Sequence, residues 1–250
     1  MRIGIMAAMP EEIQRLMTEM ASDRIEKQGM REYHQGRLWG TDAVLVFSRW
    51  GKVAAASTAT HLITQHKVDK ILFTGVAGAV DPSLHLGDIV VGAELVQHDM
   101  DASPLFPRHE IPLIGVSRFQ ADSTMTENLK LAARKFTDNE LSNAVSPELI
   151  KEFNLRAKPV VQSGLIASGD KFFASQGDLA QLRSQLPCAL CVEMEGAAVA
   201  QVCHEYDIPF AIVRTVSDSA DEHAPANFPK FIQSVASVYS FGILKEFFSS

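Results

Sequence analysis

The sequence has few cysteines, no excess of basic residues and no long apolar run. Its three cysteines, Cys188, Cys191 and Cys203, are an odd number within one short stretch, which excludes the spread disulfide framework of small secreted proteins. The first apolar run turns acidic at Glu11 and Glu12, too early for a signal peptide or a membrane span. We therefore expect a protein of the reducing cytoplasm that has no membrane partner.

Charge and composition favour a small molecule as the partner. The 250 residues include 23 Lys and Arg against 30 Asp and Glu, a net charge of −7 that repels nucleic acid and anionic lipid alike. With 46% hydrophobic and 21% charged residues, the composition is that of an ordinary globular protein. Because α/β chains of this length routinely form one domain, and no repeat or linker interrupts the sequence, we expect a single domain over residues 1–250.

Short apolar runs alternate with helical patterns along the chain. Strands are expected at residues 2–8, 43–48, 70–74, 88–95, 160–167, 190–193 and 210–216, and helices at 10–20, 52–66, 124–137, from 146, at 194–206 and at 231–247. The proline-rich stretch 99–115 is expected to be a loop. Repeated β–α units with apolar central strands predict an α/β fold with a mixed, mostly parallel sheet flanked by helices.

Polar and aromatic side chains follow several of these strands. Because ligands of open α/β sheets bind at the carboxyl ends of the strands, these residues are candidates for one site. They are Glu11 and Glu12, residues 75–78, Ser168, Asp170, Phe172, Phe173, Glu193, Met194, Glu195, Arg214, Ser217 and Asp218. Together they offer carboxylates, two aromatic rings and backbone amides.

Each candidate also has a plain structural explanation. Glu12 could complement a helix dipole, Asp218 could cap a turn, and Phe172 could belong to the core. Glu193 and Glu195 are harder to explain in this way, because an unpaired carboxylate between an apolar strand and an apolar helix is costly to bury. Taken together, the candidates therefore favour a functional site over a separate structural explanation for each residue.

Motifs of other chemistries are absent or weak. Residues 74–78 (TGVAG) match neither a dinucleotide-binding fingerprint nor a P-loop, and the sequence lacks GxSxG. Cys188 and Cys191 with His204 have no second cysteine pair, and the segment 98–101 (HDMD) has no helical histidine pair beside it. Neither place is a strong candidate for a metal.

Seven motifs in order resemble those of the 5′-methylthioadenosine/S-adenosylhomocysteine nucleosidases, within the purine nucleoside phosphorylase superfamily. They are residues 3–12 (IGIMAAMPEE), 51–56 (GKVAAA), 74–78 (TGVAG), 87–91 (GDIVV), 168–172 (SGDKF), 192–195 (VEME) and 214–218 (RTVSD). The resemblance runs over nearly the whole chain, except for a variable stretch at 102–115 and a segment at 138–158 that looks like an insertion. It implies a three-layer fold like that of nucleoside phosphorylases and hydrolases.

The resemblance implies that the chain hydrolyses the N-glycosidic bond of a 5′-substituted adenosine, such as 5′-methylthioadenosine, S-adenosylhomocysteine or 5′-deoxyadenosine, with no cofactor and no metal. Glu12 would activate the attacking water, and Asp218 would protonate N7 of the departing adenine. The resemblance also implies that Met194 and Glu195 bind the ribose and that Ala77, Gly78, Phe172 and Phe173 bind the base. Glu193, Arg214 and Ser217 would make further contacts or support these groups. The 5′ pocket would consist of Met9, Trp50, Phe228 and the partner's Pro112 in a homodimer.

Three alternatives remain open at this stage. A phosphate-dependent purine nucleoside phosphorylase would place an arginine in the loop after the first strand, where this chain has Glu11 and Glu12. An aminodeoxyfutalosine hydrolase of menaquinone synthesis would share the same catalytic residues. A nucleoside-binding or storage protein on this fold would lack Glu12 or Asp218. Trp50 could also pack under the following helix and leave the 5′ pocket to other residues.

Overall fold

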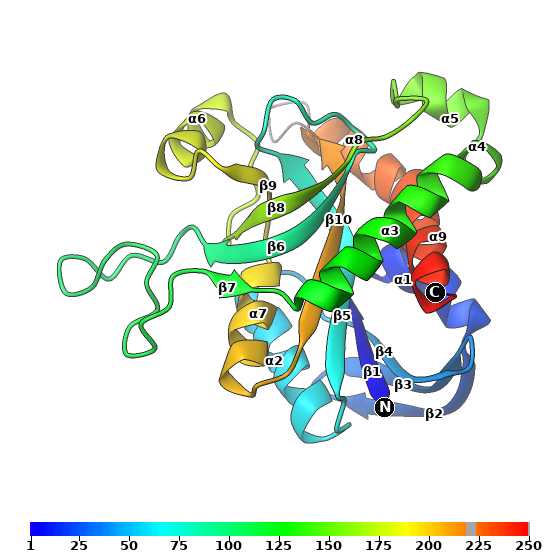
Figure 1. The fold of residues 1–250 in the computed structure, drawn as a ribbon, viewed down its shortest axis with the longest axis horizontal. Helices are drawn as coiled ribbons and strands as arrows, with labels where there is room; N and C mark the ends of the chain where they lie inside the picture. The colour runs from blue at the N-terminus through cyan, green and yellow to red at the C-terminus, as the bar shows by residue number, and fades with distance from the viewer. Residues whose placement is uncertain (219–223, 250) are drawn as a thin grey trace.

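The chain alternates strands with helices, as its apolar pattern predicts. The computed structural model describes residues 1–218 and 224–249, with only the backbone of 224–227 (Figure 1). The strands are β1 (Arg2–Ala7), β2 (Ala21–Gln28), β3 (Arg31–Leu38), β4 (Thr41–Phe47), β5 (Lys70–Ala79), β6 (Ile89–Gln97), β7 (Phe119–Gln120), β8 (Val161–Ser168), β9 (Ala189–Glu193) and β10 (Phe210–Asp218). The helices are α1 (Pro10–Glu19), α2 (Lys52–Thr64), α3 (Ser123–Asn139), α4 (Leu141–Ala144), α5 (Pro147–Glu152), α6 (Gln176–Gln185), α7 (Gly196–Glu205), α8 (Ala224–Phe231), the π-helical η1 (Ile232–Ala236) and α9 (Ser237–Phe248).

The strands form one mixed sheet in the order β10-β6-β8-β9-β5-β1-β4-β3-β2, with β7 on β6. Strand β10 pairs with β5 as well as with β6, so β10, β6, β8, β9 and β5 close into a ring from which β1, β4, β3 and β2 extend as an open wing. Five pairings among the described strands are parallel and five are antiparallel. The sheet is mixed, as expected, but less dominated by parallel pairs than the sequence suggested.

The hairpin of β2 and β3 accounts for part of this difference. Almost every residue of β2 is exposed, so its sequence (ASDRIEKQ) has no apolar alternation to reveal a strand. Gly29 and Met30, both with positive φ, make the two-residue turn. Strands β5 and β10 also run further than expected, through residues 75–79 and 217–218, so several candidate residues lie within strands.

Helices cover the sheet on both faces (Figure 1). Helices α1, α3 and α9 pack together and contribute to one apolar core, which includes Leu16, Phe136 and Tyr239. Helices α2 and α7 pack against each other and contribute to a second core on the other face, which includes Leu62 and Val199. This arrangement confirms the predicted three-layer, single-domain α/β fold.

The segment 138–158 folds into α4, α5 and their connections. Ser146 caps α5 by accepting from the amide of Leu149, as its Ser-Pro sequence predicts. Arg156 anchors the segment by pairing with the fully buried Asp88, at 3.1 Å from Oδ2. That the segment is an insertion stays a prediction.

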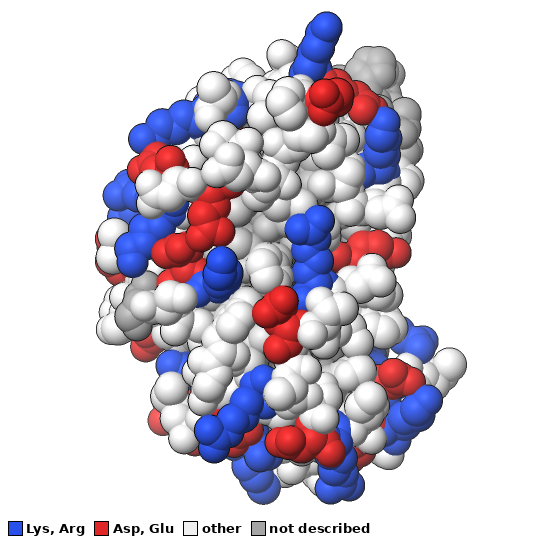
Figure 2. All heavy atoms as spheres, turned by 90° about the vertical axis from the view of Figure 1, so that its right-hand side faces the viewer, with Lys and Arg blue, Asp and Glu red and all other residues white. Residues whose placement is uncertain are grey.

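The surface carries mixed charge. Figure 2 shows basic and acidic side chains intermingled over one face of the molecule, in keeping with the net charge of −7. Among the described residues, no helix combines the length and the apolar character needed to cross a bilayer.

Candidate active site

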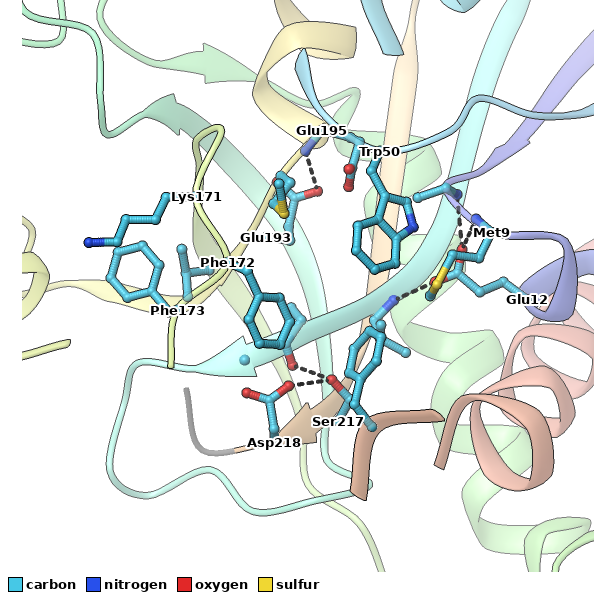
Figure 3. A pocket seen from close by; sticks show the side chains of 17 residues that line it. Met9, Glu12, Trp50, Lys171, Phe172, Phe173, Glu193, Glu195, Ser217 and Asp218 are labelled. Atoms are coloured by element: carbon cyan, nitrogen blue, oxygen red, sulfur yellow. Dashed lines mark hydrogen bonds between the residues drawn. The ribbon is translucent and has the colours of Figure 1, made fainter. Parts of the chain in front are cut away.

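A pocket of about 560 Å³ opens beside the carboxyl ends of β1, β5, β9 and β10 (Figure 3). Of the candidates at the strand ends, Glu11, Gly75, Ser168 and Asp170 do not line it. Its wall includes every residue to which the resemblance gives a role except Arg214 and Pro112: Met9, Glu12, Trp50, Ala77, Gly78, Phe172, Phe173, Glu193, Met194, Glu195, Ser217, Asp218 and Phe228. The residues that follow separate strands in the sequence are therefore neighbours in the fold.

Glu12 lies in the first turn of α1 and is almost wholly buried. Its Oε2 accepts hydrogen bonds from the backbone amides of Ala8 and Met9, both at 2.9 Å, and its Oε1 accepts from the amide of Val76 at 3.2 Å. A β-carbon at Gly75 would lie 2.8 Å from Oε1, so a larger residue there would displace the Glu12 carboxylate. The carboxylate is thus fixed by backbone from β5 and from the β1–α1 turn.

Burial raises the pKa of Glu12 to about 7, against the opposing pull of Arg214 and of the three amides. A carboxyl group with that pKa changes its protonation near neutral pH. It is therefore suited to accept a proton at physiological pH.

Arg214 and Glu193 form a buried ion pair beneath the pocket. Nη2 of Arg214 lies 2.8 Å from Oε2 of Glu193, and the guanidinium sits 4.1 Å from the centre of the Phe73 ring. Glu193 also accepts from the Ser168 hydroxyl and from the amide of Gly196, at 2.8 Å for Oε2. Arg214 does not line the pocket, and the many partners of Glu193 suit a carboxylate that positions its neighbours.

Glu195 stands between β9 and α7 and faces the beginning of α2. Its Oε1 accepts from the backbone amide of Gly51 at 2.7 Å. Gly51 has a φ of 92°, which only glycine adopts without strain. Burial and the nearby charge of Glu193 raise the pKa of Glu195.

Asp218 ends β10, where the strand's register with β5 shifts after Val216. Such a bulge turns a side chain toward a new direction, and here the Asp218 carboxylate contributes to the pocket. The Ser217 hydroxyl donates to Oδ2 of Asp218 at 2.7 Å. In Figure 3, Asp218 and Glu12 lie on different sides of the pocket.

Three aromatic rings line the pocket in a row. Phe228 meets Phe172 edge to face at a centroid distance of 5.6 Å and meets Trp50 in the same way at 6.4 Å. Trp50 is 54% exposed, so it does not pack under the helix that follows it. The Phe173 ring is buried in a core cluster against His98, so its side chain has a structural role as well as a place at the pocket wall.

Some lining residues and contacts were not predicted. Ala8, Lys171 and Val192 line the wall without a chemical motif that would mark them, whereas Val76 belongs to the predicted segment 75–78. Pro112 lies outside the pocket of its own chain, on the segment between β6 and β7, and its place in a partner's pocket stays a prediction.

The residues of the two weak metal candidates have other surroundings in the structure. Cys191 and Cys203 are buried, which raises the pKa of both thiols, whereas Cys188 is exposed. Asp99 of the 98–101 segment is paired with Lys52 at 2.6 Å. Among the described residues, the carboxylate and imidazole groups that come together as possible metal ligands lie elsewhere.

The sequence model of the phosphorylase superfamily matches residues 2–249. The chain belongs to this superfamily. Members of known structure resemble the chain closely: the 5′-methylthioadenosine/S-adenosylhomocysteine nucleosidase of Neisseria meningitidis, solved with methylthio-immucillin-A, is 33% identical with a TM-score of 0.86, covering 98% of this chain and 97% of that one. The corresponding enzyme of Colwellia psychrerythraea, solved with adenine, is 31% identical with a TM-score of 0.87, covering 100% and 95%.

A second activity is represented among the similar superfamily members. The futalosine hydrolase of Helicobacter pylori is 31% identical to this chain, with a TM-score of 0.81. The match covers 98% of this chain and 96% of the hydrolase. The superfamily relationship thus agrees with the resemblance in the motifs, and the chain is a nucleosidase-like member of it.

The raised pKa of Glu12 has a measurable consequence for stability. In the unfolded chain this group ionises near its ordinary pKa of 4.5, but in the folded protein only near 7. The contribution of Glu12 to stability is therefore fully present below pH 4.5 and is lost as the pH rises through 7. Relative to Glu12→Gln, the wild type should lose about 3 kcal/mol of unfolding free energy between pH 4.5 and pH 8.

Urea unfolding at both pH values measures this difference. The exposed neighbour provides the control, because Glu11→Gln should keep the pH dependence of the wild type. A gap between wild type and Glu12→Gln that does not change with pH would contradict the raised pKa.

Proposed function

We propose that the chain hydrolyses the N-glycosidic bond of 5′-substituted adenosines, with 5′-methylthioadenosine and S-adenosylhomocysteine as its main substrates, to adenine and the 5′-substituted ribose. The observation that carries this proposal is one pocket with Glu12, whose pKa is about 7, on one side and Asp218 on another. When a purine leaves C1′, the sugar becomes an oxocarbenium-like cation. That reaction calls for an acid at the leaving group and a base at the attacking water.

Glu12 is the proposed base. Three backbone amides hold its carboxylate in place, so little reorganisation is needed when it takes a proton from water. Below pH 7 the group is neutral and cannot accept that proton, so the hydrolysis rate rises with pH through this range.

Asp218 is the proposed acid at N7 of adenine. Its carboxyl group is oriented by the Ser217 hydroxyl, and the bulge in β10 turns it toward the pocket. Phe172, which is 37% exposed in the pocket wall, stacks on the adenine ring in this proposal, and the backbone of Phe173 contacts the base edge. Arg214 supports the site from below through Glu193 and Glu12.

Glu195 and Met194 form the proposed ribose site. An ionised Glu195 accepts hydrogen bonds from the 2′ and 3′ hydroxyls. The hydrogen bond from the Gly51 amide fixes the direction of its carboxylate. Without substrate, burial and the charge of Glu193 raise the pKa of Glu195 to about 8 against the influence of the Gly51 amide, so the group is largely protonated near pH 7. Hydroxyl groups of the sugar add to the influences that favour the ion.

Water rather than phosphate is the proposed nucleophile. The pocket wall carries Glu12, Glu193, Glu195 and Asp218, whose charge opposes the entry of phosphate. The guanidinium of Arg214 beneath the pocket is engaged by Glu193, and the ammonium of Lys171 in the pocket wall is paired with Asp178 at 2.7 Å. The presence of both Glu12 and Asp218 also argues against a binding protein without catalysis.

Replacing either proposed catalytic group should slow adenine release by at least about a hundredfold while the fold persists. The variants are Glu12→Gln and Asp218→Asn, assayed for adenine by absorbance, with circular dichroism to verify folding. In phosphate-free buffer the wild type should form the free 5′-substituted ribose. Near-normal turnover by either variant removes that residue from the mechanism, and a ribose 1-phosphate product that requires phosphate would identify a phosphorylase.

A homodimer completes the proposed site. The loop between β6 and β7 extends away from the body of the molecule (Figure 1), and it carries Leu105 and Leu113, which are 84% and 93% exposed. Apolar side chains on an extended loop favour burial against another surface. Pro112 beside Leu113 is the residue proposed to reach the neighbouring subunit's 5′ pocket.

The dimer can be tested by light scattering at micromolar concentration. Leu113→Asp should produce a monomer with a higher KM, because the partner's loop is lost from the pocket. Leu131→Asp, on the partly exposed side of α3, serves as a control that should remain dimeric and active. A wild-type monomer with full activity would refute this proposal.

Trp50 is the proposed determinant of the 5′ substituent. Its ring lines the pocket against Phe228 and adds contact area for a compact apolar group such as methylthio. Futalosine-type nucleosides, with a larger 5′ substituent, are the alternative substrates that the similarity to the Helicobacter pylori hydrolase suggests. Values of kcat/KM measured side by side for 5′-methylthioadenosine, S-adenosylhomocysteine, 5′-deoxyadenosine and aminodeoxyfutalosine decide between them.

Trp50→Ile should change the preference for 5′-methylthioadenosine over S-adenosylhomocysteine by about 1 kcal/mol or more. Turnover of 5′-deoxyadenosine should remain almost unchanged, since its 5′ methyl group reaches the indole least, and it is the internal control. An unchanged ratio between the first two substrates would assign specificity to other residues.

A cytoplasmic location, which the cysteine usage predicts, is part of the same proposal.

A further inference from the structure

A second cluster of chemically active side chains lies away from the pocket. Glu26 of β2, His61 in the last turn of α2 and His66 just after α2 each bring one ligand atom within 4.8 Å of the others. The pocket meets α2 at its first residue, Lys52, through Gly51, whereas the cluster is at the opposite end. A helix of 13 residues separates the two places by about 20 Å.

The imidazoles of this cluster have unmet hydrogen-bonding capacity. The Nε2 atoms of His61 and His66 are buried and have no hydrogen-bond partner among the residues that the structure describes. The whole His66 residue is only 3% exposed. Because buried polar atoms nearly always have a partner, two such nitrogens in one cluster point to a missing ligand.

Both rings are held in place by their surroundings. Tyr33 of β3 contacts His61 at a centroid distance of 4.6 Å and stacks on His66 at 4.8 Å. Nη1 of Arg2 donates to the backbone carbonyl of His66 at 3.1 Å, which fixes the turn after α2.

Glu26 presents one carboxylate oxygen to the histidines. Its Oε2 is near Nη2 of Arg24 and Nε2 of Gln35, both at 3.5 Å. Its Oε1 lies 4.0 Å from Nε2 of His61, too far for a hydrogen bond between them. The side chain of Glu26 is 32% exposed, which leaves a path from solvent to the cluster.

We propose that Glu26, His61 and His66 bind one divalent transition-metal ion of the Zn²⁺ type, in a structural site separate from the catalytic pocket. Two imidazole nitrogens and one carboxylate oxygen form a donor set that such ions favour, and water completes the coordination. The donor atoms lie within 4.8 Å of one another, whereas ligands held at about 2.0 to 2.2 Å from a tetrahedral ion are roughly 3.4 Å apart, so the side chains move closer together when the ion binds. The ion would connect the exposed hairpin of β2 and β3 to the end of α2.

Titration of tag-free protein with ZnCl₂ in a calorimeter tests this site, and Co²⁺ absorption reports the type of ligand. We expect one equivalent of Zn²⁺ to bind, and Co²⁺ to bind without the intense near-ultraviolet bands of thiolate ligands. The variants Glu26→Gln, His61→Gln and His66→Gln should each weaken Zn²⁺ binding at least tenfold. Adenine release by the wild type should be the same with and without chelator.

The control variant is His34→Gln. His34 also has a buried Nε2 without a partner among the described residues, and it lies 3.7 Å from the carboxylate of Glu32, but it is outside the cluster. It should therefore leave Zn²⁺ binding unchanged. A wild-type protein that binds no Zn²⁺, thiolate bands with Co²⁺, or equal Zn²⁺ affinity in the wild type and the three cluster variants would each overturn the proposal. Because binding is measured directly, these outcomes do not depend on the proposed hydrolysis.

Discussion

The buried pair of Arg214 and Glu193 is the constraint on which the site depends. Arg214 is 1% exposed, and a guanidinium in that position is tolerated only with a partner and with good geometry. Strand β10 supplies the cation and β9 supplies the anion, while both strands pair with β5. The register of three strands therefore has to be correct before this charge can be buried.

The same pair controls the two carboxylates that face the pocket. The positive charge of Arg214 opposes the effect of burial on Glu12, which keeps the pKa of that group near neutrality. The negative charge of Glu193 acts in the other direction on Glu195, whose pKa it raises. Burial is the largest cause of both raised pKa values, and Arg214 lowers the pKa of Glu195 as well as that of Glu12, so the ion pair adjusts both groups without setting them apart.

The sequence predicts the elements with a regular run of apolar residues. It misses the exposed β2, and it also misses β3 and α6, each of which buries only two large apolar side chains among polar residues. Strand β6 and helix α3 were predicted to within a few residues because their apolar residues face a core, whereas β2 is exposed and escaped notice. At the site, the residues after each strand identified most of the pocket wall. The order of residues along the chain does not tell how deeply each side chain is buried. The position of Arg214 below the pocket could therefore not be predicted. The cluster of Glu26, His61 and His66 depends on the unpredicted strand β2 and was equally invisible.

The closed ring of β10, β6, β8, β9 and β5 leaves the long strand β2 as a free edge of the sheet. A free edge is where chains can join by adding strands to one another, which leads to aggregation. Strand β2 carries Asp23, Arg24, Glu26 and Lys27, and charges of this kind make such joining unfavourable. Its polar sequence, which conceals the strand from pattern analysis, is thereby a safeguard for solubility in a crowded cell.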